Sequence, residues 1–71
     1  MAVTITKSGQ DLKVDEGSEI NNYPINDITK RVVGTSIELY LRNTLVKSFN
    51  ESEFVSPTGT AEAIADQISQ L

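Results

Sequence analysis

The chain has 71 residues, a formal net charge of −4, and no cysteine, histidine or tryptophan. Its length limits it to one domain near the size at which a hydrophobic core is only just sufficient, so we expect residues 1–71 to form one small domain. The missing residue types exclude disulfides, thiolate metal sites and histidine- or cysteine-based catalysis.

The first half of the chain predicts short strands separated by turns. Apolar and polar residues alternate over 3–6 and again over 12–15, and the Ser-Gly pair at 8–9 predicts a hairpin between these two strands. The segment 20–27 contains two asparagines and a proline, so we expect a loop or an irregular edge there. A β-branched strand follows over 28–33 and ends at a Gly-Thr turn.

The next two apolar segments predict a second hairpin, whose loop length decides its register. A two-residue loop would place Leu41 beside Val46, whereas a three-residue loop pairs Leu41 with Leu45 and Ile37 with Phe49. The second register buries more apolar area, and we predict it.

The last quarter of the chain predicts a helix over residues 60–71. Its apolar residues recur at helical spacing: Ala61, Ile64, Ala65, Ile68 and Leu71. Thr58 or Thr60 can cap the N-terminus, and Glu62 lies in the first turn, where the helix dipole favours an anion.

These elements predict a mainly β fold with one C-terminal helix. We expect a small antiparallel sheet or open barrel of about five strands over residues 2–50, a connecting loop over 50–59, and the helix as a cap. Three residues of the helix should lie on the sheet: Ile64, Ile68 and Leu71. Their expected partners are Ile37, Leu39, Leu41 and Phe49.

Carboxylates are the remaining candidates for chemistry. They cluster at two turns: Asp15, Glu16 and Glu19 at one, and Glu51 and Glu53 at the other. Hydrolysis by paired carboxylates needs a deep cleft, for which so small a body has little room, and no calcium-loop or phosphate-binding glycine motif is present. We therefore predict no catalytic residue, no metal ligand, no cofactor and no enzymatic activity.

Charge is distributed unevenly along the chain. Residues 1–27 carry a net charge of −3, residues 28–50 carry +3 and residues 51–71 carry −4. The acidic total opposes a general phosphate-backbone binder. The alternation fits a subunit whose basic middle meets an acidic end of itself or of a neighbour, although ordinary solvated surface is an equal alternative.

The number of apolar residues exceeds what one small core can enclose. Leftover apolar surface usually marks a contact with another protein, and a marginal core gains from self-association. We therefore expect a homo-oligomer with an interface that includes Val33, Tyr40, Val46 (or Leu45) and Phe54.

A small nucleic-acid-binding barrel of the Sm, SH3 or OB type is the alternative. Its basic and aromatic residues would be Lys30, Arg31, Tyr40, Arg42 and Lys47. One aromatic side chain among four cations is a thin stacking platform for single-stranded nucleic acid. The Sm type also places its helix before the strands, whereas this helix follows them.

The second half of the chain resembles small structural proteins of tailed bacteriophages. The similarity covers residues 34–71: a Gly-Thr-Ser-Ile start at 34–37, Val-Ser-Pro-Thr-Gly-Thr-Ala at 55–61, and an Ile-Ala-x-x-Ile helix. It implies a virion or assembly component that packs in many copies and has no catalytic residues. Its partners would be itself and other virion proteins, with no nucleic acid.

The same interpretation sets an expected location. No stretch approaches the roughly 20 apolar residues of a membrane helix, and the N-terminus has no signal-peptide pattern. We expect the host cytoplasm during assembly and then the virion, or simply the cytoplasm if the protein is not from a phage.

Overall fold

The computed structural model describes residues 2–71 and confirms the mainly β class with one C-terminal helix. Within that range the strands are β1 (Val3–Ser8), β2 (Asp11–Asp15), β3 (Ile20–Pro24), β4 (Ile28–Val33), β5 (Ser36–Leu41), β6 (Thr44–Asn50) and β7 (Phe54–Ser56). The helix is α1 (Ala61–Ser69), and two 3-10 turns are η1 (Ile25–Asp27) and η2 (Glu51–Glu53). The described part of the chain therefore has seven strands rather than about five.

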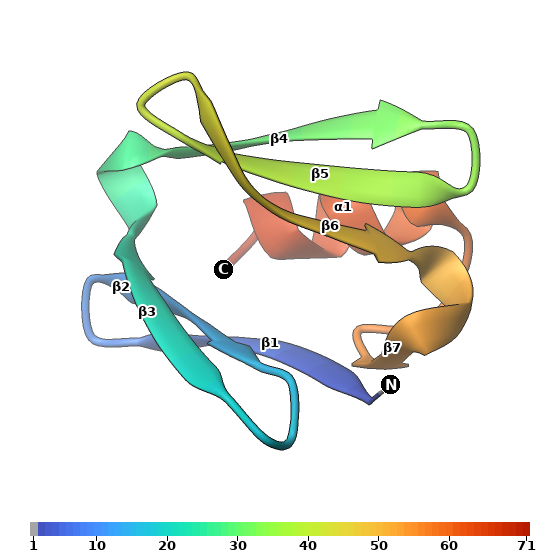
Figure 1. Ribbon diagram of the computed structural model, residues 1–71, viewed down its shortest axis with the longest axis horizontal. Helices are drawn as coiled ribbons and strands as arrows, with labels where there is room; N and C mark the ends of the chain where they lie inside the picture. The colour runs from blue at the N-terminus through green and yellow to red at the C-terminus, as the bar shows by residue number, and fades with distance from the viewer. Residues whose placement is uncertain (1) are drawn as a thin grey trace.

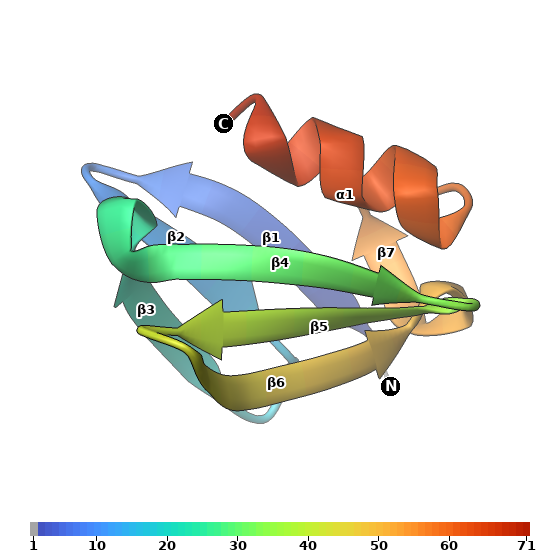
Figure 2. The same cartoon turned by 90° about the horizontal axis from the view of Figure 1, so that it is seen from above.

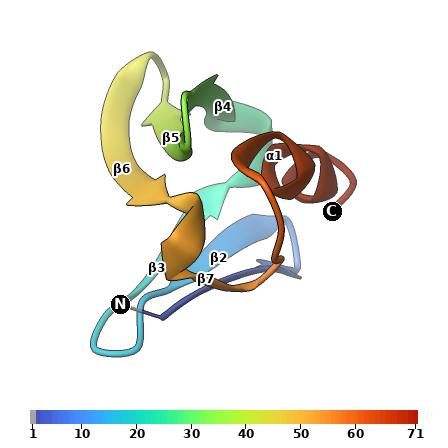
Figure 3. The same cartoon turned by 90° about the vertical axis from the view of Figure 1, so that its right-hand side faces the viewer.

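The strands form two sheets that face each other across one core. One sheet has the order β3-β2-β1-β7 and the other the order β4-β5-β6, with η1 and η2 as the connections between them (Figure 1). The helix α1 packs against β4 and β5 and closes one side of the molecule. β6 lies on the opposite side, as the views from above and from the right show (Figures 2 and 3).

The core joins both sheets and the helix. Its buried residues are Val3, Ile5, Leu12, Val14, Ile37, Leu39, Phe49, Phe54, Ala61, Ile64 and Ile68. The expected packing of Ile64 and Ile68 toward Ile37 and Leu39 is confirmed, since all four belong to this cluster and α1 contacts β5. Phe49 belongs to the same cluster, but its strand β6 lies on the side away from α1 (Figure 2). Leu41 and Leu71 differ from expectation, because Leu41 is only half-buried and Leu71 remains 42% exposed.

The segment 20–24 is a strand, which the sequence pattern did not indicate. It pairs with β2, and this register sets Tyr23 opposite Leu12 and Asn21 opposite Val14 on the inner side. Pro24 ends the strand at the sheet edge, where a missing N–H donor is tolerated. The segment is a strand rather than a loop because its backbone pairs with β2.

The β5–β6 hairpin reaches the expected pairing of Ile37 with Phe49 by a different route. The loop has two residues, Arg42 and Asn43, which both have positive φ (51° and 69°), as a type I′ turn requires. Leu41 therefore pairs with Thr44, and the expected pairing of Leu41 with Leu45 is wrong. A bulge farther along β6 then shifts the register by one residue and brings Phe49 to Ile37.

The C-terminal helix is shorter than the expected 60–71, because it starts after its cap and ends at Ser69. The Thr60 hydroxyl accepts a hydrogen bond from the Ala63 N–H at 3.2 Å, so Thr60 rather than Thr58 is the N-cap. The Glu51 carboxylate accepts from the Ala61 N–H at 2.9 Å and satisfies a second free donor. The connection 50–59 therefore contains η2, β7 and part of the helix cap rather than a plain loop.

Candidate functional site

The outer face of the β4–β5–β6 sheet carries exposed apolar side chains. Because Ile37 and Leu39 point into the core, the alternating residues of the same strands point outward. We define this outer face by Arg31, Val33, Glu38, Tyr40 and Leu45. Val33 is 46% exposed and Leu45 49%, while Tyr40 is half-buried and pairs directly with Leu45 in the strand register.

A polar pair lies between the apolar ends of this outer face. Arg31 of β4 and Glu38 of β5 are opposite each other in the register. The Tyr40 hydroxyl donates a hydrogen bond to Glu38 Oε1 at 2.8 Å, which fixes the orientation of the ring. The outer face therefore has Val33 at one end, Tyr40 with Leu45 at the other, and charges of both signs between them.

Two of the four expected interface residues do not lie on this outer face. The β6 bulge turns Val46 toward the core, where it packs partly buried, and leaves Leu45 outside in its place. Phe54 is 7% exposed, and its ring meets that of Phe49 edge-on at a centroid distance of 5.8 Å. Its neighbour Val55 is exposed, at 58%. Phe54, which we expected at an interface, therefore belongs to the core of the chain itself.

Lys47 connects the two sheets on the side away from α1. Its Nζ lies 2.6 Å from Glu16 Oε2 and 3.0 Å from Glu19 Oε1, both from the turn between β2 and β3. The side chains of Glu16 and Lys47 are largely buried, with 12% and 20% of their surface exposed, whereas Glu19 is 57% exposed. Glu16 Oε2 is buried, and the Lys47 ammonium is the charge that compensates it.

This cluster perturbs two ionisation equilibria. The carboxylates of Glu16 and Glu19 raise the pKa of the Lys47 ammonium above its ordinary value. A hydrogen bond from the Asn21 amide, followed by the contacts with Lys47, holds the pKa of Glu19 below its usual range. Each shift favours the charged form and therefore the ion pair.

The basic residues proposed for nucleic acid do not form one surface. Arg42 pairs with Asp27 at 3.0 Å on η1, and Lys47 is held by its two glutamates. Arg31 faces outward, whereas Lys30 pairs with Leu39 in the register and so faces inward. Two of the four cations of residues 28–50 are thus paired with acids of residues 1–27 in the same molecule.

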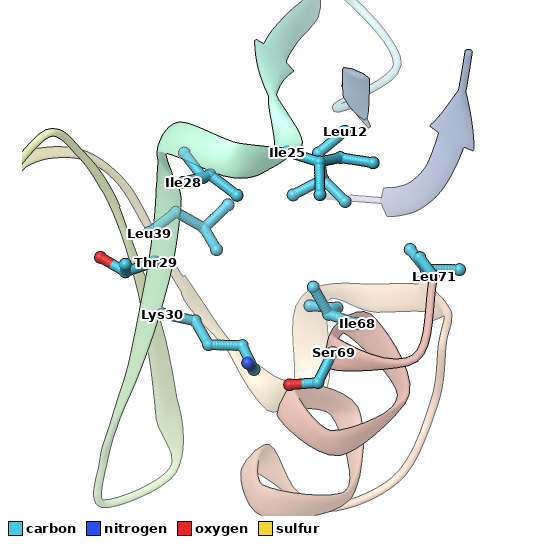
Figure 4. A pocket seen from close by; sticks show the side chains of 9 residues that line it. All are labelled: Leu12, Ile25, Ile28, Thr29, Lys30, Leu39, Ile68, Ser69 and Leu71. Carbon is cyan, nitrogen blue, oxygen red and sulfur yellow. The ribbon is translucent and has the colours of Figure 1, made fainter. Parts of the chain in front are cut away.

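A pocket of about 210 Å³ lies between the end of α1, β4 and η1 (Figure 4). Its lining residues are Leu12, Ile25, Ile28, Thr29, Lys30, Leu39, Ile68, Ser69 and Leu71. The Lys30 side chain runs from β4 toward Ser69 at the end of the helix. No local sequence pattern indicates this pocket, because its lining comes from β2, η1, β4, β5 and α1.

The clustered carboxylates have structural partners. Asp15 accepts a hydrogen bond from the Gly17 N–H at 2.8 Å, and Glu53 accepts from the Asn50 N–H at 3.2 Å. Glu51 caps α1, and Glu16 and Glu19 bind Lys47. No group of three or more acidic side chains within residues 2–71 is arranged to hold a metal ion.

Comparison with known proteins adds no relative: no family model, curated protein or solved structure matches the chain. Over the described residues, no helix is long and apolar enough to cross a membrane.

Proposed function

We propose that this protein is a non-enzymatic structural or assembly subunit that acts through contacts between copies of itself. The observation that carries the proposal is the outer face of the β4–β5–β6 sheet, where Val33 and Leu45 are exposed and Tyr40 is half-buried, on a chain with a small core. Apolar side chains that remain outside a well-formed core commonly mark protein contacts. Arg31 and Glu38 between them supply orientation, because charges at an interface select register and partner.

The outer face is a better contact than the free sheet edges. The edge strands are β3 and β7 in one sheet and β4 and β6 in the other. β3 ends in Pro24, β7 has only three residues, α1 packs against β4, and β6 contains a bulge and the bridging Lys47. Proline, bulges and lysine on an edge strand are the features that discourage strand addition. Face-to-face burial is therefore the mode of association we propose, and sheet-edge pairing is secondary.

The resemblance to small tailed-phage proteins gives the proposal its finer form, a virion component that packs in many copies. The nucleic-acid alternative has less support, since two of its four cations are engaged in ion pairs with acids of the same chain. A single-strand binder depends on free cations that follow the backbone.

Light scattering after gel filtration tests the proposal, because the chain mass is 7.8 kDa and any multimer is resolved from it. We expect a discrete multimer that survives half-molar salt, since the described ion pairs are internal and the proposed contact is apolar. Leu45→Glu should reduce the mass to that of the monomer. Ile20→Glu is the matched control, an equally exposed apolar residue (52%) on the other sheet, and should leave the multimer intact.

Two results would contradict the proposal. One is a monomer of wild-type protein at every salt concentration and protein concentration tested. The other is a multimer that is lost in Ile20→Glu and kept in Leu45→Glu, which would move the contact to the other sheet. A salt-sensitive complex with an oligonucleotide would instead favour the nucleic-acid alternative.

A further inference from the structure

The pocket at the end of α1 combines an apolar interior with one cation. Ile25, Ile28 and Ile68 form apolar walls, and Lys30 extends along the side next to Ser69 (Figure 4). Lys30 is half-buried, and none of the ion pairs within residues 2–71 involves it. A lysine can bury its aliphatic stem and leave its ammonium accessible, and an ammonium that pairs with no carboxylate of the described residues is available to a bound anion.

We infer that this pocket binds a small carboxylic acid, with the apolar body between β4 and α1 and the carboxylate on the Lys30 ammonium. The size of the pocket limits the ligand. An apolar cavity of about 150 Å³ can hold benzene, so a pocket of about 210 Å³ suits a body of about six carbons with the acid at its mouth. The Lys30 ammonium favours a negatively charged ligand, because a carboxylate would form with it an ion pair that it does not make with the described residues.

A structural role for Lys30 makes a different prediction. Its ammonium lies near the C-terminal end of α1, where a cation is favoured by the helix dipole. That role would make Lys30 important for stability but would give the pocket no preference for an acid over the matching alcohol. Binding selectivity therefore separates the two roles.

The test is a titration of the full chain with hexanoate and with 1-hexanol, followed by amide and methyl chemical shifts in NMR spectra. We expect saturable shifts at Ile25, Ile28 and Ile68 and about a tenfold preference for hexanoate, the strength of one charge-assisted hydrogen bond. Lys30→Met should weaken hexanoate binding about tenfold and change hexanol binding less than twofold. Lys30→Arg should retain the preference.

Lys13→Met is the matched control, since Lys13 is also half-buried, makes none of the ion pairs described for residues 2–71, and lies on the outer side of the other sheet, away from the pocket. It should bind hexanoate as the wild type does, and the spectra themselves report whether each variant is folded. Equal binding of acid and alcohol, or a preference that persists in Lys30→Met, would overturn the inference. The same shifts on raising the protein concentration alone would show that a second copy covers the pocket, and would overturn it too.

These results are independent of the proposed function. Hexanoate can bind a monomer, and a multimer built through the outer face of the β4–β5–β6 sheet leaves the pocket open. Failure of the titration would therefore not affect the assembly proposal, nor would a monomeric mass affect the ligand site.

Discussion

Lys47 of β6 holds Glu16 of the β2–β3 turn, with 2.6 Å between Nζ and Oε2, on the side of the molecule opposite α1. The helix covers one side of the two facing sheets with apolar contacts, whereas this ion pair joins them on the other side. The two sides therefore depend on different physical interactions. The apolar contacts of the helix do not depend on pH, whereas the Lys47 side should respond to it. Salt should screen the Lys47–Glu16 pair only weakly, because both side chains are largely buried.

We expect Lys47→Met to lower the free energy of unfolding by about 1–2 kcal/mol, because the largely buried Glu16 carboxylate loses its compensating charge. Urea denaturation measures this loss. Lys13→Met is the control, since Lys13 makes none of the ion pairs described for residues 2–71 and should cost less than about 0.5 kcal/mol. If Glu16→Gln is equally costly in the wild type and in Lys47→Met, the two side chains are not coupled.

Stability should depend on pH at both ends of the range. The folded-state pKa of Glu19 is below its ordinary 4.5. The carboxylate therefore contributes fully to the free energy of unfolding above pH 4.5, and this contribution is lost as the pH falls through the folded-state pKa. The folded-state pKa of Lys47 is above its ordinary 10.5, so its contribution is complete below that pH and is lost as the pH rises further. Urea midpoints across pH measure both limbs. Glu19→Gln should flatten the acid limb, and an unchanged acid limb in that variant would assign it to other carboxylates.

The two-residue turn between β5 and β6 should discriminate sharply between side chains at its second position. Asn43 has φ of 69°, which a β-branched residue adopts only with strain, so Asn43→Val should destabilise the protein by about 1–2 kcal/mol. Asn43→Gly should be neutral or stabilising by a few tenths, because glycine favours this turn position. Thermal unfolding gives both values. Thr44→Val, at the adjacent extended position, is the control, and a larger loss there than at Asn43 would argue against the type I′ turn.

Phe54 and Val55 should differ strongly although they are neighbours. Phe54→Leu removes the edge-on contact with Phe49 and leaves a small cavity, so it should lower the free energy of unfolding by about 1–2 kcal/mol. Val55→Ala, at a side chain 58% exposed, should change the free energy of unfolding by less than about 0.5 kcal/mol. Equal effects of the two changes in chemical denaturation would mean that β7 is not docked on the core as described.

Local patterns in the sequence predicted much of the fold. The alternation over 3–6 and 12–15 indicated the first hairpin, and the spacing of Ala61, Ile64 and Ile68 indicated the helix with its threonine cap. These elements are encoded by the period of apolar residues within a few positions, so a single segment carries the information.

The candidate surface was predicted only in part. Val33 and Tyr40 lie on the outer face as expected, but one bulge exchanged Val46 for Leu45, and Phe54 is enclosed by Phe49. A strand has a period of two, so one extra residue reverses the face of every side chain before it. No local pattern marked the position of that bulge.

The sequence by itself determined the class of the fold, the helix and most of the hairpins, because these depend on neighbours close in the chain. Only the tertiary structure decided which segments became edges and which charges met. β3 is a strand because β2 pairs with it, and β7 because β1 does. Lys47 meets Glu16, and Lys30 lines a pocket, because two sheets far apart in sequence close around one core. Such contacts arise from packing and burial between distant segments, which no window of sequence contains.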